Sequence, residues 1–373
     1  MDFEMSNELK DFQQTVRQYV EQRVLSQIRE YEDKSIFPIE IWREMGSKGF
    51  LKAHVAKEYG GLGLGTMAFC LWCEEISRAG AGMTHPPVFQ TGKMILHYGT
   101  PKQKEKYLKR LLSGEYVAAT AISEPTVGSS FADMRTKMEK RGDVFIINGV
   151  KTLINDAAEA DIINVFAKDE SGNVSVFLVE KGNPGMKILK KLDPIGMRSS
   201  PVYEFELKDC AVKPEQLIGE VGGGLKTFFA AFNFSRLGNA SAALGVAQAA
   251  LDKAVGYVKG RKVGKYIASE FQGLRWVLAE ASTKLEAARL MRNRAATMEE
   301  NKQDVSIETS RTKLMCVNVA NEVVGECIQA TGRYGCLRDS LMEMYLRDAR
   351  LLGTAGGSLE VMKNNIARSL LGG

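Results

Sequence analysis

Residues 143–155 read DVFIINGVKTLIN, a run of Val, Ile, Phe and Leu broken by single polar residues and an Asn-Gly pair. β-Branched and aromatic residues that alternate in part with polar ones are typical of a strand with one buried face. Similar short runs follow between residues 160 and 212, bounded by Gly, Asn, Asp or Pro: ADIINVFAKD, NVSVFLVEK, MKILKKL and VYEFELKDCAV. The region 119–220 is therefore predicted to be a domain of antiparallel strands joined by turns.

On both sides of this region the apolar residues recur every three or four positions instead. This helical period is clear in residues 9–25 and 38–51, and it returns in the long runs 235–260 and 269–298. Long apolar stripes of this kind suit a helix bundle, which is often shared between subunits. We therefore predict an α+β multidomain chain with an N-terminal α-helical domain (1–118), a middle antiparallel β domain (119–220) and a C-terminal four-helix bundle domain (221–373).

Composition excludes several classes of protein. The net charge of +5 comes from 50 basic and 45 acidic residues that are scattered, which argues against a nucleic-acid-binding surface. No apolar stretch reaches the ~18 residues that a membrane span needs. Six cysteines in a chain of 373 residues do not suggest a disulfide scaffold, so a cytoplasmic location is expected. Cys70 and Cys73 are expected one turn apart in mid-helix, without further metal ligands.

A series of short motifs occurs in order along the chain. They are EYGGLGLG (58–65), GTPKQKEKYLKRLLSGE (99–115), AISEPTVGSS (121–130), IINGVKTLIN (146–155), PIGMRSSPVYEFELKDCAV (194–212), SRLGNASAALGVAQAALDKAVGYV (235–258), SEFQGLRWVLAE (269–280) and YLRDARLL (345–352). Each is similar to the corresponding block of the acyl-CoA dehydrogenases, with similar separations. The chain thus resembles that family along nearly its whole length.

The resemblance implies an FAD-dependent oxidoreductase acting on an acyl-CoA or another acyl thioester. In that family a carboxylate removes a proton from the α-carbon of the thioester, and the β-hydrogen leaves as a hydride to the flavin. The resemblance also implies that FAD is bound between subunits, in a homotetramer or in a heterotetramer with a homologue. An electron-transfer flavoprotein is one candidate electron acceptor.

The β domain and its loops carry the first group of flavin-binding positions that the resemblance implies. Ser123 and Ser129, in AISEPTVGSS, match residues that bind the flavin and its pyrophosphate, although a simple turn is the alternative for both. Leu153 and Asn155 stand where the family commonly has Trp and Thr or Ser. Leucine provides shape without aromatic stacking, and Asn155 retains a donor for flavin N5.

The C-terminal domain carries the second group. Arg261, in VKGRKVG, matches the arginine that reaches the neighbouring subunit's pyrophosphate, with a plain surface arginine as the alternative. Gln329, Gly332 and Arg333 lie in the block that grips the ADP portion, where Arg333 replaces a glycine. At the start of the last helix, Ser358 and Glu360 are expected to serve helix capping or FAD contact.

The position of the family's catalytic base is altered. The family sequence Tyr-Glu-Gly-Thr corresponds here to residues 355–358, AGGS, so that Gly356 stands at the glutamate position. Some members place the base just before an arginine of the first long C-terminal helix, and that position is Ser235. A serine does not act as a base unless another group activates it. Both base positions therefore lack a carboxylate, and the catalytic residue is not identified by the sequence.

The remaining substrate contacts implied by the resemblance are Ser129, Asn233, Arg236 and Gly357, whose backbone N–H is used on the thioester oxygen. Lys93 is expected to be solvated, with pairing to an acidic acyl group as the alternative. Several functions stay open: a dehydrogenase with a displaced base, a non-oxidative elimination enzyme similar to the desulfinases, a non-catalytic subunit of a heterotetramer, and a biosynthetic desaturase acting on a carrier-protein thioester.

Overall fold

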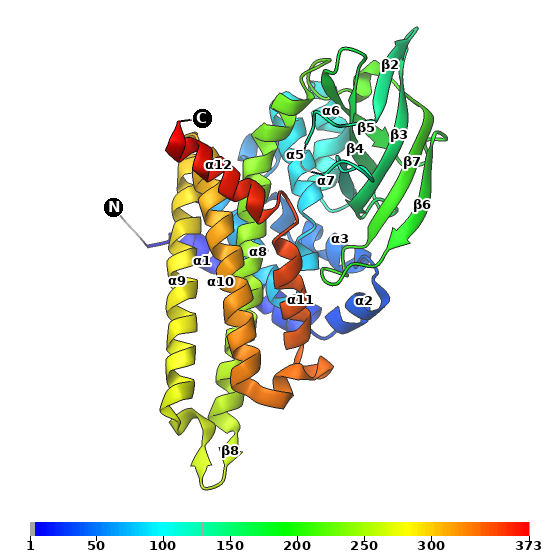
Figure 1. Cartoon of the computed structure of the whole chain (residues 1–373). Helices are drawn as coiled ribbons and strands as arrows, with labels where there is room; N and C mark the ends of the chain where they lie inside the picture. The colour runs from blue at the N-terminus through cyan, green and yellow to red at the C-terminus, as the bar shows by residue number, and fades with distance from the viewer. Residues whose placement is uncertain (1–3, 129, 373) are drawn as a thin grey trace.

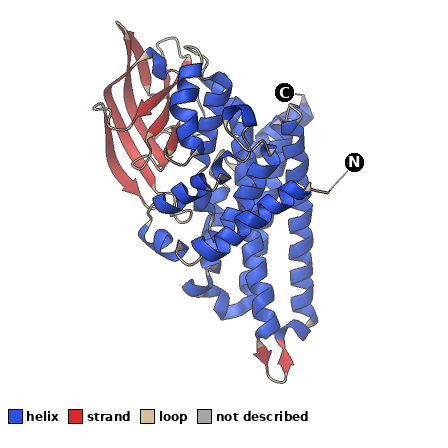
Figure 2. Cartoon of the chain, turned by 180° about the vertical axis from the view of Figure 1, so that it is seen from behind, coloured by secondary structure: helices blue, strands red, loops and turns tan. Residues whose placement is uncertain are grey.

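The computed structural model describes residues 4–128 and 130–372, and it shows two helical parts with a β sheet packed at one side (Figures 1 and 2). The helices of the N-terminal part are α1 (Asn7–Tyr19), α2 (Ile28–Lys34), α3 (Ile39–Ser47), α4 (Gly65–Ile76), α5 (Pro86–Tyr98), α6 (Pro101–Gln103) and α7 (Lys109–Leu112). Thr100 and Gln103 form a capping box at the start of α6, because the side chain of each accepts a hydrogen bond from the backbone N–H of the other. Cys70 and Cys73 are buried in α4, away from its ends.

The strands form one twisted sheet in the middle of the chain. They are β1 (Ala118–Ala121), β2 (Lys137–Arg141), β3 (Val144–Asn155), β4 (Ile162–Lys168), β5 (Val174–Glu180), β6 (Met186–Leu192) and β7 (Val202–Val212). Their order is β1-β4-β2-β3-β7-β6, with β5 added to β4. Most pairs are antiparallel as predicted, whereas β1 pairs parallel to β4 and β2 meets β4 in parallel at one residue. Apolar periodicity does not distinguish these two directions of pairing.

The C-terminal part is a helix bundle built around one long helix. Its helices are α8 (Gly224–Gly260), α9 (Gln272–Glu300), α10 (Ser306–Thr331), α11 (Met342–Leu352) and α12 (Leu359–Leu371). Helix α8 lies against α4, α5, α9 and α10, and its run of small residues from Ala240 to Ala250 allows this close packing. A short hairpin, β8 (Lys262–Val263) with β9 (Tyr266–Ile267), extends from the end of α8 and was not predicted.

A buried acidic contact joins the three parts. Asp348 of α11 accepts hydrogen bonds from the backbone N–H of Ala81 (2.8 Å) and of Met197 (2.6 Å), and Glu32 of α2 accepts one from Ser199 (2.8 Å). Both carboxyl groups are fully buried. These contacts fix the sheet against the helices, while the domain boundaries at residues 118 and 220 stay a prediction. Among the described residues, no helix combines the length and the apolar character of a bilayer-crossing segment.

Candidate active site at the Gly356–Gly357 loop

The loop between α11 and α12 has a shape that its glycines make possible. Gly356 has φ of 63° and Gly357 has φ of 88°, a left-handed conformation that other residues adopt only with strain. The loop ends at Ser358, whose hydroxyl accepts a hydrogen bond from the backbone N–H of Val361 at 3.3 Å. Ser358 is thus the N-cap of α12, as the sequence predicted for the start of this helix.

A buried lysine stabilises the loop between α11 and α12 through hydrogen bonds to its backbone. Lys313 of α10 donates hydrogen bonds from Nζ to the backbone carbonyl oxygens of Ala355 and Gly357. Burial lowers the pKa of Lys313 to about 7, and the positive charge of Arg236 contributes to the same shift. Sequence reasoning missed this residue. The one signal was a lysine directly before a mostly apolar stretch of α10. Lys313 fixes the backbone on either side of Gly356.

Asn239 of α8 fills the volume in which a side chain at position 356 would begin. A Cβ added to Gly356 would lie 2.1 Å from Asn239 Nδ2 and 3.9 Å from Lys313 Nζ. The positive φ therefore favours glycine at this position, and a Cβ here requires the Asn239 amide to shift. Asn239 is buried, and its Oδ1 has no hydrogen-bond partner among the described residues. No feature of the sequence predicted this contact, because positions 239 and 356 are far apart in the chain.

Arg236 lies on the same side of α8 as Asn239. Its Nη1 donates to Asn233 Oδ1 at 3.0 Å, and its guanidinium lies 4.6 Å from the ring centre of Phe232. Phe232 in turn lies 3.4 Å from the place of a Cβ on Gly357. Arg236 is 5% exposed, and burial lowers its pKa to about 10. The structure thus brings together Asn233, Arg236 and Gly357, which were predicted as substrate contacts.

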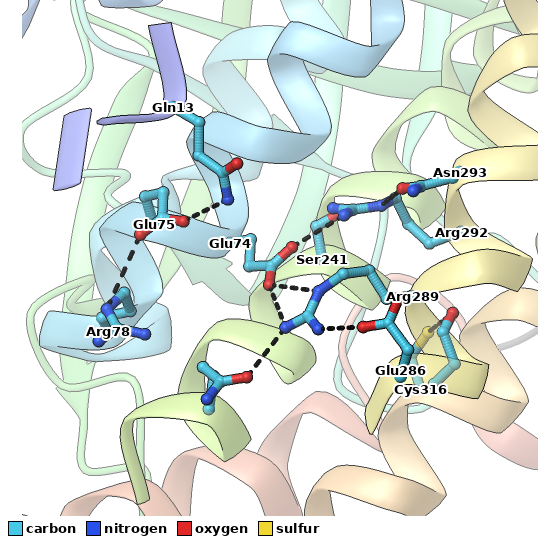
Figure 3. Close-up of polar contacts among 12 residues, drawn as sticks. Gln13, Glu74, Glu75, Arg78, Ser241, Glu286, Arg289, Arg292, Asn293 and Cys316 are labelled. Atoms are coloured by element: carbon cyan, nitrogen blue, oxygen red, sulfur yellow. Dashed lines mark hydrogen bonds and ion pairs between the residues drawn. The ribbon is translucent and has the colours of Figure 1, made fainter. Parts of the chain in front are cut away.

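Two cations are buried at this loop without a carboxylate. Within the described ranges, neither Lys313 nor Arg236 forms an ion pair, and Arg236 Nε has no hydrogen-bond partner. Further along α8 the arrangement differs, because Glu74 of α4 pairs with Arg289 and Arg292 of α9 (Figure 3). The loop is therefore a place of unbalanced positive charge.

The predicted flavin positions of the sheet lie on β3 and the loop beside it. Leu153 has φ of 58° and is 64% exposed, at an irregularity in the pairing of β3 with β7. Asn155 does not point its amide freely outward: Nδ2 donates to Ser200 Oγ (3.0 Å) and to the Ser200 carbonyl (3.2 Å). Ser200 Oγ donates to Asp156, which also contacts His85 Nδ1 at 3.1 Å. Asn155 is therefore part of a buried polar chain that the sequence did not predict.

An ion pair fixes the loop that carries Ser123. The carboxylate of Glu124 accepts hydrogen bonds from the backbone N–H of Arg135 (2.7 Å) and Thr136 (2.9 Å) and from Lys151 Nζ (2.9 Å). Ser123 itself is half-buried, and its carbonyl accepts from the N–H of Thr152 at 3.0 Å. Ser129 lies outside the described residues. Glu124 and Lys151 hold this loop against β3, a role that sequence reasoning missed.

Of the second group of predicted flavin positions, Ser358 and Glu360 lie at the start of α12, and the other four lie at the ends of α8 and α10. Gln329, Gly332 and Arg333 are exposed at the end of α10, and Arg261 is exposed where the β8–β9 hairpin begins. Tyr257 and Tyr334 stack with ring centres 4.7 Å apart, which joins the two helix ends. Figure 1 shows the hairpin at the opposite end of the molecule from the sheet. One chain therefore keeps Arg261 and the predicted positions at the end of α10 apart from the predicted flavin positions of the sheet.

Comparison with protein families covers nearly the whole chain. Residues 6–115, 119–210 and 222–371 match the family models described as acyl-CoA dehydrogenase N-terminal, middle and C-terminal domains, respectively. The chain belongs to the acyl-CoA dehydrogenase family. Its homologues are FAD-dependent oxidoreductases, which confirms the predicted family, fold class, enzyme type and cofactor.

Individual relatives have full-length similarity to this acyl-CoA dehydrogenase family member. It is 35% identical over 362 residues to a 3-(aryl)acrylate reductase of Clostridium sporogenes, covering 95% of this chain and 96% of the relative. It is 32% identical to a short-chain specific acyl-CoA dehydrogenase of Clostridium acetobutylicum, covering 97% and 98%. The structure of butyryl-CoA dehydrogenase from Megasphaera elsdenii matches with a TM-score of 0.96 and 30% identity, covering 100% of both chains.

One residue, Lys93, differs from what the sequence suggested, and the role of a second, Glu360, stays a prediction. Lys93 is not solvated: it pairs with Glu299 at 2.8 Å and lies 4.5 Å from the ring centre of Phe234, with 14% of its side chain exposed. The solvated orientation expected for Lys93 is therefore wrong, because α9 presents a carboxylate to α5. Glu360 is exposed in the first turn of α12 and lies 3.8 Å from Lys363. Its predicted FAD contact stays a prediction.

Proposed function

We propose that this chain is a flavoprotein that binds FAD and an acyl thioester, and that its chemistry proceeds without the family's glutamate. The observation that supports this most strongly is the loop at residues 355–357, which is fixed by Lys313 although Gly356 carries no side chain. A loop that had lost its function would not need two glycines with positive φ and a buried lysine. The loop retains its shape and its backbone N–H groups, whereas the base is missing.

The residues present fit FAD when two chains are combined. The exposed apolar Leu153 offers a surface for the flavin ring, and exposed Arg261 and Arg333 offer cations for its phosphates. Because the two groups lie at opposite ends of one chain, we propose that FAD is held between subunits of a homotetramer, or of a heterotetramer with a homologue. When bound, FAD supplies the acceptor or donor of a hydride.

The acyl thioester is placed at the Gly357 loop by this proposal. The backbone N–H of Gly357 donates to the thioester oxygen, and Lys313 keeps that N–H in position by fixing the carbonyls on either side of Gly356. Neither Gly356 nor the hydroxyl of buried Ser235 takes a proton from the α-carbon. Ordinary α,β-dehydrogenation should therefore be slower by about 10²–10⁴-fold, the usual contribution of a general base.

Non-oxidative elimination from an acyl thioester is the second candidate function. The basic side chains Arg236 and Lys313 favour this function, because they would stabilise the negative charge that develops on a leaving group of the substrate. This reaction does not depend on the family's glutamate. A non-catalytic subunit and a desaturase for carrier-protein thioesters are the remaining alternatives, and the experiment below separates them.

Flavin absorbance of the purified protein tests the proposal directly. The wild-type protein should be yellow, should bind butyryl- and octanoyl-CoA, and should reduce its flavin slowly or not at all. The Cβ of Gly356→Glu alone would lie 2.1 Å from the Asn239 amide, so the informative variant is Gly356→Glu with Asn239→Ala, which should gain flavin reduction. Gly356→Gln with Asn239→Ala is the matched control, since it has the same shape without a base.

Each other outcome has a definite meaning. Flavin reduction by the wild-type protein at rates usual for the family would show that an unidentified base exists, and the proposal would be wrong. A colourless protein that needs a homologue to bind FAD would support the partner-subunit alternative. Binding of the thioester only when it is attached to a carrier protein would support the desaturase.

A further inference from the structure

Two basic side chains are buried at the candidate active-site loop without an acidic partner, an arrangement that favours binding of an anionic ligand. Arg236 and Lys313 are both buried, and within the described ranges no carboxylate pairs with either. Burying a cation without a partner is unfavourable, even after local relaxation. Two backbone carbonyls partly relieve this cost for Lys313. Among the residues that the structure describes, Arg236 has only the amide of Asn233 and the ring of Phe232.

The unpaired atoms at this place have the chemistry of an anion site. Among residues 4–128 and 130–372, Arg236 Nε is a buried donor without an acceptor, and Asn239 Oδ1 is also unpartnered. A guanidinium offers two parallel donors that match the two oxygens of a carboxylate. The missing side chain at Gly356 leaves no carboxylate of the protein to fill this role.

We propose that the site takes an acyl thioester whose acyl chain carries its own carboxylate, which Arg236 binds. The inference rests on the proposed function and narrows it to a class of substrate. Phe232 lies next to both Arg236, whose guanidinium is 4.6 Å from its ring centre, and Gly357, whose Cβ position is 3.4 Å from the ring. Gly357 is the residue proposed to hold the thioester oxygen. The carboxylate of a short dicarboxylic acyl group would therefore lie at the loop itself.

The phosphates of CoA are the other source of negative charge. A phosphate at Arg236 would place the CoA tail, not the acyl group, against the Gly357 loop, which contradicts the position proposed for the thioester. Comparison of dicarboxylic and neutral thioesters of equal size separates the two sources, because both compounds carry the same CoA.

Calorimetric binding to the FAD-loaded protein tests this inference. Succinyl-CoA and 4-methylpentanoyl-CoA are matched in size, since an isopropyl group replaces the carboxylate. Succinyl-CoA should bind about 10- to 100-fold more tightly, the usual effect of a hydrogen-bonded charge pair. Arg236→Met should abolish this ratio, and Arg236→Lys should retain part of it. The ratio is the readout, so a general loss of stability in either variant does not produce the expected result.

Binding of the same two thioesters to the variant Gly356→Glu with Asn239→Ala is a second, independent test. The new carboxylate begins near Lys313 and should replace the substrate's carboxylate, so the preference for succinyl-CoA should disappear or reverse. Equal binding of the two thioesters by the wild-type protein would overturn the inference while leaving the proposed function intact. Equal loss of both in Arg236→Met would show that Arg236 binds CoA or supports the loop. Failure to bind any CoA thioester would instead refute the proposed function.

Discussion

Helix α8 passes two groups of buried charge that differ in one respect. Near Ser241, the Glu74 carboxylate pairs with Arg289 at 2.8 Å and with the fully buried Arg292 at 2.8 Å, and Ser241 accepts from Arg292 at 3.2 Å (Figure 3). Near Gly356, neither Arg236 nor Lys313 pairs with a carboxylate in the part of the chain that the structure describes. The first group is balanced within the chain and the second is not.

The pKa of Glu74 shows how neighbouring arginines compensate for the burial of a carboxylate. Burial by itself raises the pKa of the Glu74 carboxyl, but the charges of Arg292 and Arg289 outweigh burial, so the net shift is downward. At the loop, burial lowers the pKa values of Lys313 and Arg236 with no opposing anion. A charge buried for stability is neutralised where it lies, whereas one that is left unpaired is available to a ligand.

Removal of Glu74 should have the largest effect on stability. Glu74→Gln leaves the cations Arg289 and Arg292 without their shared anion, and it should lower the free energy of unfolding by about 3–5 kcal/mol. The control is Glu286→Gln, which removes an exposed partner of Arg289 and should change stability by less than about 1 kcal/mol. Thermal unfolding of the FAD-loaded variants measures both. Similar small shifts would show that the Glu74 group is not a structural charge cluster.

Replacement of Arg261 tests an unpaired cation on the surface. If its guanidinium binds a phosphate of FAD in a neighbouring subunit, Arg261→Ala should lower FAD affinity by about 1.5–3 kcal/mol. Lys262→Ala, in the same hairpin, serves as the control and should have little effect. Titration of the apoprotein with FAD measures both affinities, and an unchanged value for Arg261→Ala would identify it as an ordinary surface residue.

Removal of Lys313 should separate stability from binding. Lys313→Met eliminates an unfavourably buried cation but leaves two carbonyls unpaired, so stability should fall by only about 1–2 kcal/mol. Because the loop is no longer fixed, affinity for acyl-CoA should fall by about tenfold or more, an energy of ~1.4 kcal/mol. A loss of stability as large as that of Glu74→Gln would place Lys313 among the structural charges and remove the contrast.

Asp348 tests how a carboxyl group buried near a second one, Glu32, responds to pH. Burial, together with the charge of Glu32, raises the pKa of Asp348 from 3.8 to about 8. Between these pH values the folded chain keeps a proton that the unfolded chain has lost, so stability should fall as pH rises through this window. The slope contributed by one proton is at most about 1.4 kcal/mol per pH unit. Asp348→Asn should flatten the pH dependence of the melting temperature, and an unchanged slope would contradict the assignment.

The smallest expected effect is proton uptake on binding. At pH 8 a lysine with a pKa of about 7 is mostly neutral, and a carboxylate bound nearby favours its charged form. When succinyl-CoA binds at pH 8, the protein should therefore take up about one proton per site, because binding and protonation of Lys313 are thermodynamically linked. Calorimetry in buffers of different ionisation enthalpy measures this uptake. It should be absent with 4-methylpentanoyl-CoA and in Lys313→Met, and equal uptake with both thioesters would argue against a carboxylate near Lys313.

The sequence predicted the order of the three parts because the apolar period changes with the type of structure. Strands such as β3 alternate, and helices such as α9 repeat every three to four residues. The β8–β9 hairpin was missed because strands of two residues have no period. The resemblance pointed to Arg236 and Gly357 and placed Gly356 at the glutamate position, and these site assignments stay predictions. It did not find Asn239 or Lys313, whose roles arise only when α8, α10 and the loop pack together.

The contact between Asn239 and Gly356 has a consequence for how such a site changes over time. The Asn239 amide lies 2.1 Å from the position of a Cβ on residue 356, so the two positions share one volume. A Cβ at 356 displaces this amide, and a φ of 63° strains residues other than glycine there, whatever the space. A smaller residue at 239 removes the first obstacle and leaves the second. The residues at 239 and 356 are therefore expected to change together.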